Sequence, residues 1–266
     1  MTNGPSHRPA LHVIGREVRE IRTAQGISLR ELARRLGLSP ALLSAWETGE
    51  RRPEDATLAQ ILGYLRVAPR AYTFLMRLHE QSGCRTYVEA NEPGTPSLQM
   101  AYERHALRTL EWAPRVVPDL LQPYEYAHAV LASHVDRPDV IDEEILARQV
   151  RRIDRDHRHR HTVLLGEAAV ASKIVPSENA EARPDRIIDA TQAHRADIRV
   201  VPEEACPMGT IEPFVIHETA ENIFAVILRH HHTTVYSSAP ETVDRYWSTF
   251  DSLRQAAVGY GLAGSP

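Results

Sequence analysis

The sequence predicts a multidomain chain: an all-α domain of five helices over residues 1–83, then an α+β domain over residues 97–266. The length of 266 residues is enough for two domains at roughly 150 residues each. Short amphipathic segments separated by glycines fill the first part, whereas helical and extended patterns alternate in the second. Residues 84–96 are rich in Gly, Pro, Thr, Asn and Glu, a composition typical of a linker.

Charge is distributed unevenly between these parts. The whole chain has a formal net charge of −4. Residues 1–83 contain 12 arginines and 8 acidic residues, a net charge of +4, and residues 84–266 have a net charge of −8. Such an asymmetry indicates that one part of the chain binds a polyanion and the other part has a different task.

Composition excludes several classes of protein. No apolar run reaches the ~18 residues that a membrane helix needs, and the N-terminus lacks the apolar stretch of a signal peptide. Cys84 and Cys206 are too far apart to suggest a disulfide framework or a zinc ribbon. We therefore expect a cytoplasmic protein with two free thiols, no cofactor and no membrane partner.

The first domain begins with a helix whose apolar stripe, Val13, Val18 and Ile21, ends at Gly26. Ser28 then caps a helix over residues 29–36: its hydroxyl can accept the amide of Glu31, and Glu31 can reach back, which is a capping box. Gly37 ends this helix. Further helices are predicted over residues 40–48, with Ser39 as cap and Pro40 at the first position, and over residues 56–65 and 70–81.

Residues 28–53, SLRELARRLGLSPALLSAWETGERRP, form a helix, a tight turn and a second helix. The second helix of such a unit can lie in the ~12 Å major groove of DNA. With the flanking residues 13–27, this stretch resembles the Xre/λ-repressor-like helix-turn-helix family. The resemblance implies a buried ion pair between Arg22 and Glu47, and it places Leu32, Ala33 and Leu36 against Leu38, Leu43 and Trp46.

Two sets of residues are expected to contact DNA. By position, those that face phosphate are Ser28, Arg30, Arg34, Arg51 and Arg52. By resemblance, those that face base edges are Pro40, Ala41, Ser44 and Ala45. None of the second set is the Gln, Asn or Arg that makes bidentate base contacts, so we expect modest direct readout, with the rest of the specificity from DNA shape, dimer spacing or a neighbouring arginine.

Ten elements are predicted in the second part of the chain. The helices cover residues 97–113, 123–134, 140–155, 181–196 and 240–258, and the strands, about five in a mostly antiparallel sheet, cover residues 162–167, 198–202, 212–217, 223–229 and 233–237. The last three strands are closely spaced, which predicts a meander.

Several short runs in this part form a recognisable pattern: Glu111-Trp112, the run from Val117 to Ala127, and residues 198–202 and 213–216. In these residues the chain resembles a domain of unknown function that follows Xre-type modules in antitoxin-like actinobacterial regulators. Asp119 and Pro123 depart from the Gly and Thr of that pattern, which leaves the role of this turn open. The resemblance brings no known chemistry, so it implies a regulatory partner more than a reaction.

Two histidine clusters and one carboxylate offer an alternative. His157, His159 and His161 alternate, and His230, His231 and His232 are consecutive at a predicted hairpin, so together they could hold a transition metal. A polar helix exit and a polar hairpin tip explain the two clusters better, because Arg158 and Arg160 interleave with the first cluster and would repel a metal cation. Glu167, at a strand end, could act as a general base, or as a helix cap or ion-pair partner.

These observations predict a homodimeric, sequence-specific transcriptional regulator that binds double-stranded operator DNA. Its second domain would sense a small molecule or bind a small protein, in the manner of an antitoxin. The first alternative is an enzyme derived from such a regulator, with a metal held by the histidines as one version of its catalysis. The second is a protein-interaction module in which the helical hairpin docks without DNA.

Overall fold

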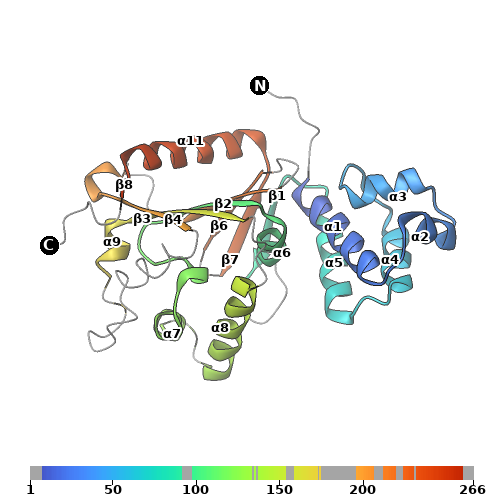
Figure 1. Cartoon of the computed structure of the whole chain (residues 1–266), viewed down its shortest axis with the longest axis horizontal. Helices are drawn as coiled ribbons and strands as arrows, with labels where there is room; N and C mark the ends of the chain where they lie inside the picture. Colours follow the sequence, from blue (N-terminus) through green and yellow to red (C-terminus); the bar gives the residue numbers. More distant parts are fainter. Residues whose placement is uncertain are drawn as a thin grey trace.

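Five helices form the first part of the chain, and a sheet flanked by helices forms the rest (Figure 1). The structure is a computed structural model. It describes residues 8–91, 98–133, 135, 137–153, 159–172, 174, 196–206, 212–219, 224–230 and 232–259.

The five helices of the N-terminal domain begin and end close to the predicted bounds. They are α1 (Pro9–Ala24), α2 (Leu29–Leu36), α3 (Pro40–Glu47), α4 (Asp55–Tyr64) and α5 (Pro69–Gln81). Ser28 accepts the amide of Glu31 at 3.1 Å, and Gly37 ends α2 with a positive φ of 67°. The Glu31 carboxylate lies 3.8 Å from Arg35, so in the described structure only the serine half of the capping box forms. Ser39 precedes α3 without a side-chain cap.

Eight strands form one mixed sheet in the described part of the chain. They are β1 (Thr86–Ala90), β2 (Arg108–Ala113), β3 (Arg160–Gly166), β4 (Ala196–Val201), β5 (Phe214–Glu218), β6 (Phe224–Arg229), β7 (Thr233–Ser237) and β8 (Val258–Gly259). Their order is β1-β7-β6-β5-β2-β3-β4-β8. β2, β3 and β4 are parallel to one another, and the remaining pairs are antiparallel, including the predicted meander β5-β6-β7.

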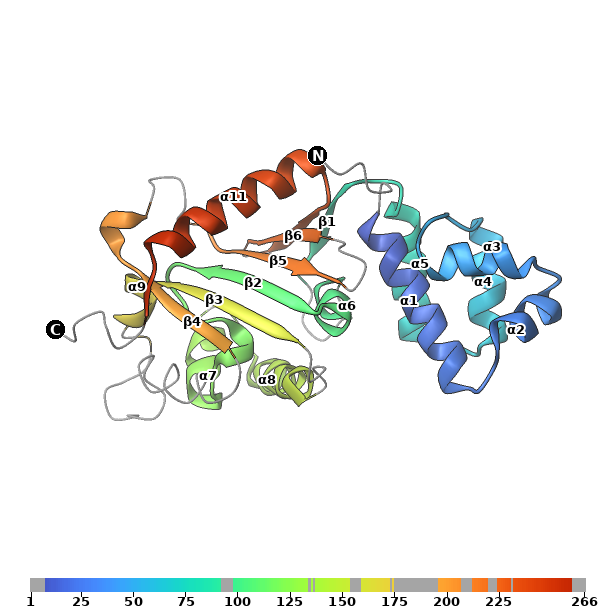
Figure 2. The ribbon, with the colours of Figure 1, turned by 45° about the horizontal axis from the view of Figure 1, so that its top comes forward.

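Helices cover both faces of this sheet (Figure 2). α11 (Pro240–Ala256) lies on one face, where Phe250 and Leu253 pack with Leu110, Trp112 and Phe214. On the other face lie α6 (Leu98–His105), η1 (Asp119–Leu121), α7 (Tyr124–Ala132) and α8 (Pro138–Ile153). Two short helices, α9 (Glu167–Val170) and η3 (Glu203–Ala205), follow β3 and β4. No helix among the described residues is long and apolar enough to cross a membrane.

The first helix predicted for this domain is shorter in the structure. The expected helix over residues 97–113 ends at His105, and residues 108–113 form β2. β2 buries Thr109 and Glu111 on one face as well as Leu110 and Trp112 on the other, so both of its faces are covered although its sequence alternates polar and apolar residues.

The expected linker contains β1, which pairs with β7 about 150 residues away. Local composition does not reveal such a distant partner. With β1, β2 and the short β8 added, the sheet has eight strands rather than about five. The helix expected over residues 181–196 lies outside the described residues, except that Ala196 begins β4.

Candidate nucleic-acid interface and C-terminal cavity

α2 and α3 form a helix-turn-helix with one buried and one exposed side. Leu32, Ala33 and Leu43 are fully buried, and Leu36, Leu38 and Trp46 pack against them. Burial of this stripe fixes the angle between the helices, and it leaves the opposite sides of α2 and α3 in solvent. Trp46 therefore belongs to the core of the domain.

Arg22 and Glu47 form a buried, bidentate ion pair between α1 and α3. The Nε and Nη2 atoms of Arg22 lie 2.7 and 2.8 Å from the two carboxylate oxygens, and its Nη1 donates to the carbonyl of Ile27 at 2.7 Å. Both side chains are less than a tenth exposed. This geometry satisfies both charges where water is excluded, so the pair fixes the orientation of α3 against α1.

Two glycines allow α1 to approach the end of α3 closely. A Cβ on Gly15 would lie 2.4 Å from the carbonyl oxygen of Trp46. A Cβ on Gly49 would lie 2.7 Å from the Cα of His12, and the φ of Gly49 is +75°. Neither position has room for a side chain, so the close packing that positions α3 depends on both glycines.

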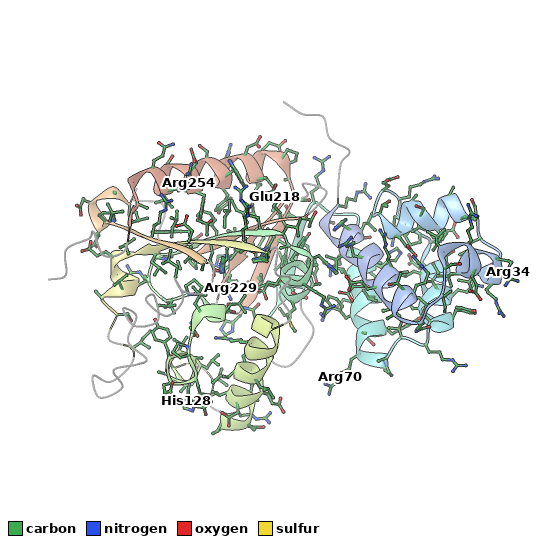
Figure 3. All side chains as sticks on the ribbon, viewed as in Figure 1. Arg34, Arg70, His128, Glu218, Arg229 and Arg254 are labelled. Atoms are coloured by element: carbon green, nitrogen blue, oxygen red, sulfur yellow. The ribbon has the colours of Figure 1, made fainter. Side chains whose placement is uncertain are left out.

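The side chains expected to contact DNA lie mostly in solvent. Ser28, Arg30, Arg34, Pro40, Ala41, Ser44 and Arg51 are exposed, and Ala45 is half-buried. All belong to α2, α3 or the residues that flank them. Arg34 lies on α2, at the end of the domain far from the sheet (Figure 3). The exposed side of the helix-turn-helix thus presents three arginines beside small side chains.

Arg52 is exposed like the other arginines but also makes contacts within its domain. Its guanidinium donates to Asp55 at 2.9 Å, to the hydroxyl of Ser82 at 3.2 Å and to the carbonyl of His79 at 3.3 Å. These bonds join the loop after α3 to α4 and to the end of α5. They use the Nε and Nη2 atoms of Arg52, and no described hydrogen bond uses its Nη1 atom.

The histidines of the two clusters that the structure describes do not come together in a metal site. His159 bonds the carbonyl of Ala106 at 2.8 Å, and His161 bonds Glu111 at 3.0 Å. His230 and His232 flank the β6–β7 hairpin, whereas His157 and His231 lie outside the described residues. Glu167, the proposed base, accepts the backbone amide of Glu203 at 3.1 Å.

A search of the described residues for metal-ligating groups finds instead Glu17, Glu20 and His105. His105, on α6, lies with Nε2 3.3 Å from Glu17 and Nδ1 3.3 Å from Glu20, both on α1. Arg104 also lies 2.6 Å from Glu17. A cation already pairs with Glu17, so we interpret this group as an ion-pair contact between the two domains.

A cavity of about 270 Å³ lies on the face of the sheet that carries η1, α7 and α8. Its floor is formed by β2, β5 and β6, and its walls by the chain between Pro114 and Gln122 and by α7 and α8. Sequence reasoning missed this cavity, because its lining residues come from segments more than 100 residues apart.

A charged network lies beside the cavity. Arg229, at the end of β6, donates to Asp119 at 2.9 Å and lies 3.5 Å from Glu111. Figure 3 places Arg229 on the side of the sheet that faces α7 and α8. The carboxylate of Asp119, followed by that of Glu111, raises the pKa of Arg229 further above its ordinary value. Asp119, the departure noted in the sequence pattern, is therefore an ion-pair partner of β6.

The fold and the exposed helix-turn-helix define a DNA-binding protein with an appended α+β domain. Residues 18–71 match the helix-turn-helix family of the Xre/λ-repressor type. Residues 97–260 match the domain of unknown function DUF5753, and the chain belongs to that family. The helix-turn-helix match supports a DNA-binding regulator.

Comparison with other proteins adds little beyond the family. No curated protein matches the chain in sequence. Among solved structures, the chain is similar to TrmBL2, described as an archaeal chromatin protein with a novel mode of DNA binding, at 12% identity and a TM-score of 0.33. The match covers 76% of this chain and 66% of that one. A similarity this low carries no argument about function.

Proposed function

We propose that the protein is a sequence-specific transcriptional regulator that binds operator DNA as a homodimer, with a C-terminal domain that senses a ligand or a small protein. The observation that carries the proposal is the exposed side of α2 and α3, where Arg30, Arg34 and Arg51 lie in solvent on a domain with a net charge of +4. A basic surface beside an exposed helix suits the phosphates and the major groove of duplex DNA.

Contacts with DNA divide into two kinds. α3 enters the major groove, with Pro40, Ala41 and Ser44 facing base edges, and Ala45 close behind. Ala41 and Ala45 suit a thymine methyl group, and the Ser44 hydroxyl can donate or accept. Arg30, Arg34 and Arg51, together with Ser28 and the free amides at the start of each helix, bind phosphates on either side of the groove.

The first test is binding of the full chain to its own upstream DNA over a series of salt concentrations. We expect tight binding at low salt that weakens steeply as salt rises, with a slope of about −0.9 per phosphate neutralised. Arg51→Ala should weaken binding to all sequences and reduce the magnitude of the slope by about 1.

Arg245→Ala is the matched control, because Arg245 is an exposed arginine on α11, away from α2 and α3. It should bind DNA like the unchanged protein. If the unchanged protein fails to bind its upstream DNA at low salt, or binds unrelated DNA equally well, the proposal is wrong.

A further inference from the structure

The cavity in the C-terminal domain lies where α/β sheets commonly bind ligands. It adjoins the carboxyl end of the parallel strand β2, where the chain leaves the sheet for η1, α7 and α8 before it returns as β3. Next to β2, the sheet changes from parallel pairing with β3 to antiparallel pairing with β5. The crevice at the carboxyl ends of parallel strands is the usual place for a small molecule in open α/β sheets.

The size and the walls of the cavity limit the ligand. A volume of about 270 Å³ exceeds the ~150 Å³ that holds a benzene molecule and lies just below the range of ~300–1,000 Å³ for drug-sized ligands. Apolar side chains provide much of the surface, among them Val116, Val117, Val130, Val215 and Ile227. These walls fit an apolar body of about one substituted ring.

Acceptor groups at the cavity are already occupied. One oxygen of Glu111 faces Arg229, and the other lies 3.0 Å from His161. Asp119 accepts from Arg229, and the side-chain oxygen of Gln122 accepts from Arg148 at 3.0 Å. A cationic ligand would have to break one of these pairs in a half-dry site, at a large desolvation penalty.

Donor groups at the cavity are in excess. Arg115 lies at its edge, exposed to solvent, and has no side-chain partner among the residues that the structure describes. Arg148 donates one hydrogen bond to Gln122 and one to Glu144, so part of its five-donor fork is unused. Three arginines and two carboxylates line the site, a net charge of +1.

We propose that this cavity binds a small organic anion, with a carboxylate or phosphate held by Arg115 and Arg148 and a single-ring apolar body held between the valines and Ile227. Guanidinium groups recognise both kinds of oxyanion through paired hydrogen bonds. The proposal deepens the sensing role under the proposed function. Binding at the cavity is nevertheless measured without DNA, so either claim can fail alone.

The experiment measures binding of four matched probes to the full-length protein by ligand-observed NMR: benzoate, phenyl phosphate, benzylammonium and benzyl alcohol. We expect at least one of the two anions to bind with a Kd on the order of 1 mM, and the cation and the alcohol to bind at least about tenfold more weakly. The two anions separate a carboxylate ligand from a phosphate ligand. Equal binding of all four probes, or binding of neither anion, would overturn the proposal.

Variants locate the site. Arg115→Gln should weaken binding of the anion about tenfold, because it removes one charge-assisted hydrogen bond. It should leave the thermal stability unchanged, because Arg115 is exposed and makes no hydrogen bond or ion pair with the residues that the structure describes. Arg245→Gln, on the far side of the sheet, should leave anion binding unchanged. Arg51→Ala should bind the anion normally although it binds DNA poorly. If Arg115→Gln and Arg245→Gln bind the anion equally well, the cavity is not the site.

Discussion

Glu47 joins α3 to α1 through a buried ion pair. It supplies both acceptors to the buried guanidinium of Arg22, which also holds the turn after α1 through Ile27. The pair follows from family resemblance and not from local pattern, because a glutamate near the end of an eight-residue helix normally lies in solvent. Glu47 is buried because α1 packs across α3 and brings Arg22 against it.

Glu47→Ala should lower the free energy of unfolding by about 3–5 kcal/mol, because it leaves the Arg22 charge buried without a partner. Urea denaturation followed by circular dichroism measures the change. Glu50→Ala is the matched control, since Glu50 is exposed three residues away and should change stability by no more than about 0.5 kcal/mol. Equal effects of the two substitutions would show that the ion pair does not hold α3.

At the scale of elements, the helices were easier to predict than the sheet. Glycine and serine set the bounds of α2 and α3 within the local sequence: Ser28 caps α2, Gly37 takes a positive φ where α2 ends, and Gly49 does so two residues after α3. β1 and β2 were missed because their identity depends on partners far along the chain. Each of these strands contains a buried glutamate, a residue type that is uncommon in buried strands. Glu89 in β1 accepts a hydrogen bond from Tyr236, and Glu111 in β2 pairs with His161.

Contact between α1 and α6 should make stability depend on pH. Burial raises the pKa of the Glu17 carboxyl, but hydrogen bonding to His105 and the charge of Arg104 outweigh it, so the pKa lies below its ordinary value. The unfolded carboxyl then binds a proton more readily than the folded one. Its contribution to stability is therefore present above the ordinary glutamate pKa and is lost as pH falls through the lowered folded value.

Thermal unfolding from about pH 7 down to about pH 3 measures this loss. Glu17→Gln should lower the melting temperature at neutral pH and reduce the further fall on acidification. Glu80→Gln, an exposed position on α5, should keep the full pH dependence of the unchanged protein. If Glu17→Gln and Glu80→Gln titrate alike, Glu17 does not contribute to the contact.

For the whole molecule, the two domains are physically joined. Buried side chains of the helical domain form one cluster with Leu98, Ala101 and Tyr102 of α6 and with the sheet residues beneath them. α8, which carries Arg148 at the cavity, packs on α6, and α6 packs on α1 (Figure 2). The net charge of −4 is the sum of a basic helical domain at +4 and an acidic remainder at −8 that contains the cavity.

The central claim is that a dimer of this chain reads an operator through α3. Hydroxyl-radical footprinting of the full-length protein on its own upstream DNA tests it most directly. We predict two protected half-sites on one face of the duplex, about one helical turn or ~34 Å apart, which Arg51→Ala weakens together and Arg245→Ala leaves intact. A single unpaired footprint would contradict the dimer, and no protection at low salt would contradict DNA binding itself.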